Sequence, residues 1–169
     1  LLLVGVGLVL RASFKPGTRD FWRRWVEIAA AATLVSLGSA MIFGPRFIWF
    51  GILHFVAAAL VLARPLVRLD AWNLVIGAGV LAFGLLYANP LFNATPANVI
   101  GLVTEKPMTE DYVPLLPWFG VVQVGMALGA LWQQRGWSLT PSLQRLNDTP
   151  PRLLRFLGTW ALTIYLIHQ

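Results

Sequence analysis

The chain has 169 residues, of which 57% are hydrophobic and 12% are charged, and its mean hydropathy is +0.69. An average soluble domain is about 45–50% apolar and about 25% charged, so these charges are too few to cover a soluble globule of this size. The net charge of +6 lies in the gaps between apolar runs, which argues against a nucleic-acid-binding face. The absence of cysteine excludes a disulfide framework, and two histidines are too few for a histidine-rich metal site.

Apolar segments follow one another along the chain, and a helix that spans a membrane needs about 20 mostly apolar residues. Residues 1–10 form only a half-span, and their positive charges come after them, which is the reverse of a signal peptide. We expect them to be the end of a helix that begins earlier. Full spans are expected over residues 25–43, 47–63, 71–88 and 115–132, and a last segment runs from Pro151 to Gln169.

The sequence therefore predicts an all-α fold. We expect one transmembrane domain over residues 1–169, incomplete at both ends. It would be a polytopic helical bundle of about five full spans plus the truncated N-terminal half-span. Gly44-Pro45, Asn89-Pro90 and Pro117 separate these segments, because proline lacks the N–H group that continues a helix.

The basic residues predict the orientation. If successive loops alternate between the two sides of the membrane, eleven of the 13 Lys and Arg residues fall on one side, and only Arg46 and Lys106 fall on the other. The basic side is then cytoplasmic. We expect an integral protein of a bacterial inner membrane, with the lipid bilayer as its partner and the long loop 89–114 outside.

Two local patterns predict contacts. Gly125 and Gly129 form a small-xxx-small pair, which allows close helix approach. We expect this pair to pack inside the bundle in preference to forming a dimer face, although a homo-oligomer stays open. Glu27 follows Arg24 and Arg23 by three and four residues, so a local ion pair is expected there.

Polar residues inside or beside the apolar segments are the candidate catalytic groups, because burying them in a membrane is costly. His54 is expected roughly 12 Å along its helix from Arg46, and His168 roughly 24 Å from Arg152, at 1.5 Å per residue. Both depths lie toward the outer face, where Asp111 precedes the next span. These depths permit His54, Asp111 and His168 to converge on one cavity, where a carboxylate-oriented histidine could act as a general base. The alternative is that the three residues are unrelated.

Three arginines cluster at the start of the last segment: Arg145, Arg152 and Arg155. A helix N-terminus with nearby arginines can hold the diphosphate of coenzyme A or of a nucleotide. Anchoring to anionic lipid headgroups is the alternative, and it is the one favoured by the positive-inside pattern. No metal site is predicted.

Three stretches stand out together: FGILH at residues 50–54, DYVPLLPWFG at 111–120 and LTIYLIHQ at 162–169. In this order they resemble the bacterial members of the heparan-alpha-glucosaminide N-acetyltransferase catalytic-domain family. The DY-x-PLxPW stretch is the most specific of the three. The resemblance covers residues 19–169.

The animal enzyme of that family moves an acetyl group from cytosolic acetyl-CoA to a glucosamine amine beyond a membrane. The resemblance therefore implies an integral membrane acyltransferase. Its acyl donor would be acetyl-CoA at the cytoplasmic face, and its acceptor would be an amine or hydroxyl of a sugar or glycan outside. His54 and His168 match two histidine positions of the family, but its principal histidine would precede Leu1, so we expect residues 1–169 alone to be inactive.

Two other functions stay open. A transporter or permease for a small polar or acylated molecule is the main alternative, although the sequence has no convincing internal repeat of the kind found in many transporters. A purely structural membrane subunit is the third, and the polar residues expected near the outer face argue against it.

Overall fold

The computed structural model describes residues 1–12, 19–136, 151–153, 156, 160 and 163–164, and within these ranges the fold is helical without a β-strand. The α-helices are α1 (Leu2–Ala12), α2 (Arg19–Phe43), α3 (Ile52–Ala63), α4 (Trp72–Leu86) and α5 (Trp118–Gln134). Short 3-10 helices lie between them: η1 (Gly44–Arg46), η2 (Arg64–Leu69), η3 (Pro90–Phe92) and η4 (Ala97–Ile100). The predicted all-α class is confirmed for this part of the chain.

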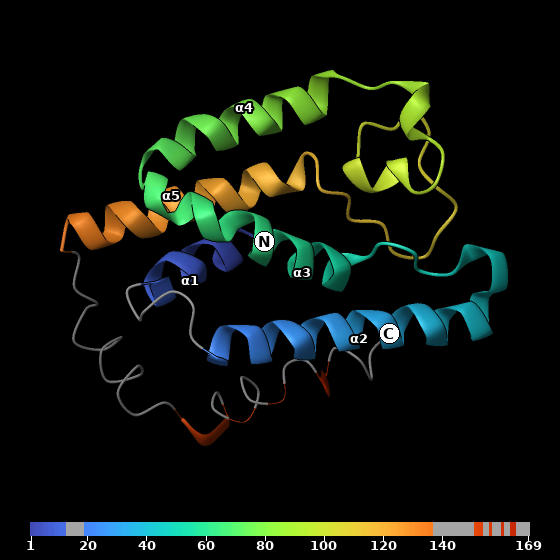
Figure 1. The fold of residues 1–169 in the computed structure, drawn as a ribbon, viewed down its shortest axis with the longest axis horizontal. Coiled ribbons are helices and arrows are strands. Elements are labelled where there is room, and N and C mark those ends of the chain that lie inside the picture. The colour runs from blue at the N-terminus through green and yellow to red at the C-terminus, as the bar shows by residue number, and fades with distance from the viewer. Residues whose placement is uncertain (13–18, 137–150, 154–155, 157–159, 161–162, 165–169) are drawn as a thin grey trace.

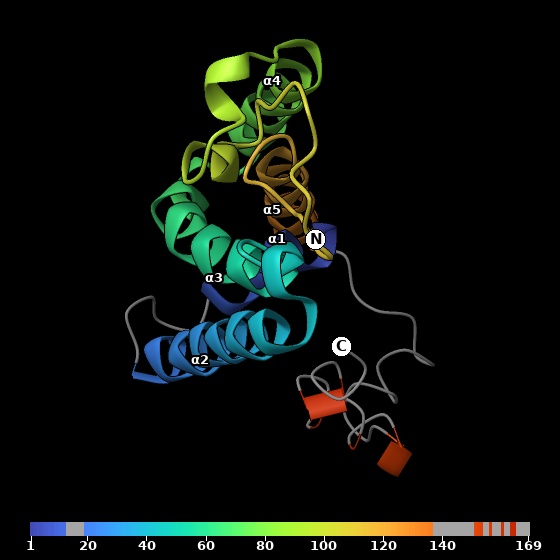
Figure 2. The same cartoon turned by 90° about the vertical axis from the view of Figure 1, so that its right-hand side faces the viewer.

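The helices stack in layers, with α2 against α3, and α5 between α1 and α4 (Figures 1 and 2). Successive helices run in opposite directions along the bundle (Figure 1). The helices α1, α3 and α5 consequently end at the same end of the molecule at which α2 and α4 begin. Where α1, α3 and α5 meet they enclose the buried core, which consists of Val9, Phe55, Ala59, Ala63, Val122, Met126 and Ala130.

Small residues allow α5 to approach its neighbours closely. A Cβ on Gly125 would lie 2.1 Å from the Leu2 carbonyl oxygen of α1, and one on Gly129 would lie 3.2 Å from the Val6 carbonyl oxygen. On the opposite side, a Cβ on Gly120 would lie 2.6 Å from the Gly77 carbonyl oxygen of α4. The predicted use of the Gly125–Gly129 pair for packing inside the bundle is confirmed.

Aromatic and basic side chains join the first turns of α2 to α3 and to the beginning of η2. The Trp25 indole donates a hydrogen bond to the Ala57 carbonyl oxygen at 2.8 Å. The Arg64 guanidinium lies over the rings of Phe21 and Trp22, 4.9 and 5.4 Å from their centres, where the ring faces attract a cation. In the first turns of α2, the predicted local ion pair forms between Arg23 and Glu27 at 3.1 Å.

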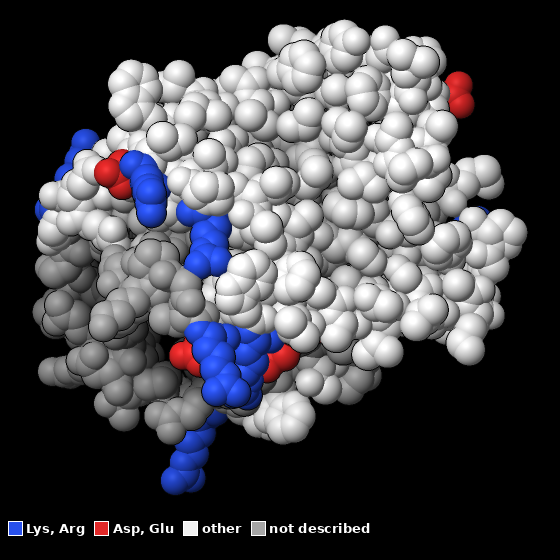
Figure 3. All heavy atoms as spheres, viewed as in Figure 1, with Lys and Arg blue, Asp and Glu red and all other residues white. Residues whose placement is uncertain are grey.

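Basic residues gather at this end of the bundle. Figure 3 shows most of the visible Lys and Arg side chains over the end where α2 begins and α5 ends, while much of the remaining face is uncharged. Apolar side chains elsewhere are strongly exposed, such as Met41 of α2 at 84% and Leu86 of α4 at 87%. A surface with exposed apolar side chains and one basic end is the kind that suits a lipid bilayer.

The prediction of five full spans is wrong for the part of the chain that the structure describes. Two stretches are long and apolar enough to cross a membrane, Arg19–Arg46 and Ile52–Leu69, and only 17% and 22% of the residues in their most apolar windows are buried. Helix α4 has 15 residues and α5 has 17, so each is shorter than a typical span of about 20. The backbone around Pro90 and Pro117 leaves the α-helical path, which shortens these helices relative to the apolar runs. Most of the predicted last segment, from Pro151 to Gln169, lies outside the described residues.

The predicted start of the third segment at Phe47 is also wrong, because α3 begins at Ile52. Residues 47–51 are not helical, and their backbone polar groups bond to other parts of the chain. His54 therefore lies in the first turn of α3 and not roughly 12 Å along a helix from Arg46, as the rise per residue had predicted.

Candidate functional site

Two segments far apart in the sequence meet at the beginning of α3, at the opposite end of the bundle from most of the basic residues. We call residues 46–54 and 109–113, where they contact each other, the α3 junction. Two of the predicted site residues, His54 and Asp111, belong to it. The junction therefore brings together one histidine and one carboxylate from the two predicted motifs.

Backbone hydrogen bonds hold the two segments of the junction side by side. The Glu110 N–H donates to the Arg46 carbonyl oxygen and the Val113 N–H to that of Phe50, both at 3.2 Å. Phe50 and Tyr112 form a single parallel β-bridge between these bonds. The pairing satisfies backbone groups that a helix beginning at Phe47 would have used, which explains why the helix begins later.

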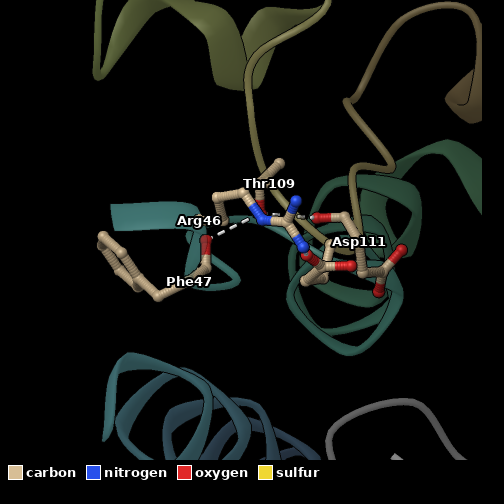
Figure 4. Close-up of polar contacts among 5 residues, drawn as sticks. Arg46, Phe47, Thr109 and Asp111 are labelled. Atoms are coloured by element: carbon tan, nitrogen blue, oxygen red, sulfur yellow. Dashed lines mark hydrogen bonds and ion pairs between the residues drawn. The ribbon is translucent and has the colours of Figure 1, made fainter. Parts of the chain in front are cut away.

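Side chains add to this pairing. The Thr109 hydroxyl donates to the Phe47 carbonyl oxygen at 2.7 Å, and Figure 4 shows it between that carbonyl and Asp111. Arg46 forms an ion pair with Glu110, but 59% of the arginine side chain and 35% of the glutamate side chain are exposed. An ion pair this accessible to solvent contributes little stability, so the hydrogen bonds carry most of the attachment.

Asp111 caps α3 from a distance in sequence. Its Oδ2 accepts a hydrogen bond from the Ile52 N–H at 2.8 Å, one of the amide groups at the helix start that have no partner inside the helix. The residue at the N-cap position, Gly51, has no side chain that could do this. A negative charge there also interacts favourably with the helix dipole.

Gly51 allows this contact because it has no Cβ. A Cβ at Gly51 would lie 2.2 Å from Asp111 Oδ2 and 2.8 Å from the Ile48 side chain. Both are shorter than real contacts of a Cβ atom. Glycine is needed here for close approach and not for an unusual backbone angle, since its φ is −95°.

His54 is half-buried on the other side of the same helical turn. Its Nε2 lies 3.1 Å from the Ser36 hydroxyl of α2, and that hydroxyl also lies 2.7 Å from the Ile48 carbonyl oxygen. The imidazole packs against the Phe50 ring with centres 5.8 Å apart. No hydrogen bond joins His54 to Asp111, whose Oδ2 is occupied by the helix N-terminus. The two residues share the junction without forming the carboxylate–histidine pair considered from the sequence.

Tyr112 connects the junction to the long loop 87–117. Its hydroxyl donates to the Asn98 carbonyl oxygen at 2.6 Å. Burial raises the pKa of Tyr112 to about 12, because the charged phenolate would lose hydration, so this hydroxyl stays a donor at neutral pH. The loop is also bonded to itself, for example from Asn93 to Thr104 at 2.8 Å. The junction therefore has an ordered loop beside it.

The other predicted site residues do not enter this geometry. His168, Arg145 and Arg155 lie outside the described residues. Arg152 falls in the described stretch 151–153, where it is exposed. Convergence of His168 with His54, and a phosphate site built from the three arginines, therefore stay predictions.

Sequence reasoning missed Ser36, Ser39, Thr109 and Gly51. A signal existed for the two serines, because hydroxyl residues three positions apart in an apolar helix lie on one face and often bond to a neighbouring helix. Ser39 is 6% exposed, accepts from the Ile48 N–H at 2.9 Å and donates to the Ser36 carbonyl oxygen at 3.0 Å. Together the two serines hold both backbone polar groups of Ile48.

Metal ligands do not cluster at the junction. Within the described ranges, no group of three or more His, Asp, Glu or Cys side chains is placed to hold a metal ion.

The sequence model of one protein family, described as "Heparan-alpha-glucosaminide N-acetyltransferase, catalytic", matches residues 1–169. The chain belongs to this family. The match spans the whole chain and confirms the resemblance carried by the three motifs. Two of them, at residues 50–54 and 111–120, meet in the α3 junction. Comparison with curated proteins and with solved structures gives no match.

Proposed function

We propose that this protein is an integral membrane acetyltransferase. It would transfer an acetyl group from acetyl-CoA on the cytoplasmic side to an amine or hydroxyl of a sugar on the outer side of a bacterial inner membrane. Membership of an N-acetyltransferase family supports the reaction type. The observation that carries the proposal is the α3 junction, where family motifs bring His54 and Asp111 together at the opposite end of the bundle from most of the basic residues.

His54 is the proposed general base at the acceptor end. The acceptor nitrogen or oxygen must lose a proton as it attacks the thioester, and a half-buried neutral imidazole can take it. Asp111 is proposed to act indirectly, by capping α3 and so fixing the turn that carries His54. His168 is proposed to line the same site.

The donor is proposed to bind at the basic end. Arg145, Arg152 and Arg155 would contact the diphosphate of coenzyme A, since guanidinium groups bind phosphate oxygens in a bidentate way. Replacing all three with Gln should raise the KM for acetyl-CoA without changing the KM for the acceptor. An equal rise in both would point to a folding defect instead.

The proposal is tested with the intact protein in proteoliposomes. Radiolabelled acetyl-CoA is placed on one side and a panel of amino sugars on the other, and label on the sugar is measured. Transfer that requires the protein and falls at least about 100-fold in His54→Ala supports the proposed base, since general bases contribute about 10²–10⁴-fold. Labelled molecules that cross intact, without acetyl transfer, would indicate a transporter instead.

Orientation has its own test. Residues 1–169 contain no cysteine, so Thr104→Cys, made in a protein freed of any other cysteine, gives a single labelling site in the exposed part of loop 87–117. A maleimide that cannot cross membranes should label it in intact cells. Labelling only after lysis would reverse the proposed orientation.

A further inference from the structure

The Ser36 hydroxyl lies between two groups that differ in their capacity for hydrogen bonds, the Ile48 carbonyl oxygen and His54 Nε2. The Ile48 carbonyl oxygen, 2.7 Å away, can only accept a hydrogen bond. His54 Nε2, 3.1 Å away, can donate or accept, depending on which ring nitrogen carries the proton. A serine hydroxyl has one proton to donate, so only one of the two contacts can receive it.

The burial of Ile48 decides between the two arrangements. Ile48 is 3% exposed, so its carbonyl oxygen cannot turn to water if the serine proton points elsewhere. Leaving a buried carbonyl without a donor is more costly than turning a neutral imidazole to its other tautomer. The Ser36 proton therefore goes to Ile48, and the serine oxygen offers only lone pairs to His54.

Ser39 keeps this arrangement in place. It accepts from the Ile48 N–H and donates to the Ser36 carbonyl oxygen, so both polar groups of Ile48 are held by α2. The acceptor that receives the Ser36 proton is thus itself fixed. This makes the direction of the Ser36 hydroxyl a property of the packed α2–junction contact and not of a freely rotating side chain.

We propose that Ser36 is a positioning residue that keeps the proton of neutral His54 on Nε2 and leaves Nδ1 as the basic nitrogen. The catalytic part of this inference rests on the proposed function. Among the described residues, no hydrogen bond occupies Nδ1, whereas Nε2 is committed to Ser36. The substrate proton would consequently move to Nδ1.

The chemical step balances with this assignment. The acceptor nitrogen bonds to the carbonyl carbon of the acetyl thioester, and the carbon–sulfur bond breaks with its electron pair leaving on sulfur. The proton lost by the nitrogen moves to His54 Nδ1 and then to the coenzyme A thiolate. Throughout, Nε2–H stays bonded to Ser36, which accepts a stronger hydrogen bond while the ring is cationic.

The tautomer is measurable without any substrate. The intact protein in nanodiscs is labelled with ¹⁵N-histidine, and comparison with His54→Gln identifies the signals of His54. At a pH where the ring is neutral, we expect a protonated Nε2 and an unprotonated Nδ1. Ser36→Ala should give a mixture of both tautomers, and Ser36→Thr should restore the wild-type signals.

Thr33→Ala is the matched control, since it removes an exposed hydroxyl about one turn earlier along α2 that donates to the Ala29 carbonyl oxygen of the same helix. It should leave His54 mainly protonated on Nε2 even if the protein becomes less stable. A proton on Nδ1 in the wild type, or the wild-type tautomer in Ser36→Ala, would overturn the inference.

Activity then separates this inference from the proposed function. In the acetyl-transfer assay, Ser36→Ala should lower kcat about 2- to 10-fold with little change in either KM, because the His54 rings that carry their proton on Nδ1 cannot accept the substrate proton there. An unchanged kcat would refute the positioning role. If the wild-type protein transfers no acetyl group while the tautomer is as expected, the proposed function fails and the assignment of the His54 proton stands.

Discussion

The contact between Gly51 and Asp111 gives a quantitative test of the α3 junction. In Gly51→Ala the added Cβ would lie 2.2 Å from Asp111 Oδ2, whereas real Cβ contacts essentially never fall under 3.0 Å. The carboxylate oxygen must then move by at least about 0.8 Å, the difference between these two distances. The hydrogen bond from the Ile52 N–H to this oxygen is 2.8 Å long. Moving the oxygen away by this amount would lengthen it to about 3.6 Å, which is beyond hydrogen-bonding distance.

The expected cost follows from what is lost. A hydrogen bond to a charged group contributes about 1.5–3 kcal/mol, and a charge at a helix N-terminus about 0.3–1 kcal/mol. Alanine is also a poorer N-cap than glycine, which adds a few tenths of a kcal/mol. We therefore expect Gly51→Ala to lower the free energy of unfolding by about 2–4 kcal/mol.

A double-mutant cycle isolates the contact. In an Asp111→Ala background the capping bond is already absent, so Gly51→Ala should cost about 1 kcal/mol or less, from the poorer cap and the Ile48 contact. The free energy of unfolding is measured by denaturant titration of the intact protein in mixed micelles, followed by tryptophan fluorescence. Gly38→Ala is the control, because a Cβ there meets nothing within 4 Å. Additive effects within about 0.5 kcal/mol would refute the reasoning.

Three further predictions concern the bundle and its loop. Gly125→Ala should destabilise the protein by about 1–3 kcal/mol, because the added Cβ would clash with the α1 backbone. Gly79→Ala is the control: its Cβ would meet nothing within 4 Å, so it should be neutral or stabilising by up to about 1 kcal/mol. Equal effects of the two variants in denaturant titrations would contradict the α1–α5 contact. Tyr112 holds its proton in the folded protein up to a pKa of about 12, whereas an unfolded tyrosine ionises near 10, so wild-type stability should fall as pH rises through this window. The melting temperature of wild type should fall between about pH 10 and pH 12 more steeply than that of Tyr112→Phe. Parallel curves of melting temperature against pH for the two proteins would contradict this prediction. The Gln123 side-chain oxygen is buried and has no hydrogen-bond partner among the described residues. Gln123→Met removes this unsatisfied polar atom at similar volume and should stabilise the protein by about 1 kcal/mol in a denaturant titration. A loss of stability would mean that the oxygen has a partner.

Much of the architecture follows from sequence patterns alone. The apolar segments separated by Gly44-Pro45, Asn89-Pro90 and Pro117 correspond to successive helices, because proline ends helices by a local mechanism. The Gly125–Gly129 pair and the Arg23–Glu27 pair also form as expected, since helical spacing alone places their members on one face. The three motifs at residues 50–54, 111–120 and 162–169 together indicated the family that the comparison confirms.

The α3 junction was decided only by tertiary structure. The start of α3 depends on Asp111, whose bond to Ile52 N–H spans 59 positions and leaves no trace in local periodicity. For the same reason the apolar run at residues 47–51 predicts a helix, although its backbone forms hydrogen bonds with Thr109, Val113 and α2. The sequence by itself thus determined where apolar helices form and which residues are polar among them. Only the packed structure decided which of those polar groups share hydrogen bonds, because such bonds depend on contacts between distant segments and not on spacing within one helix.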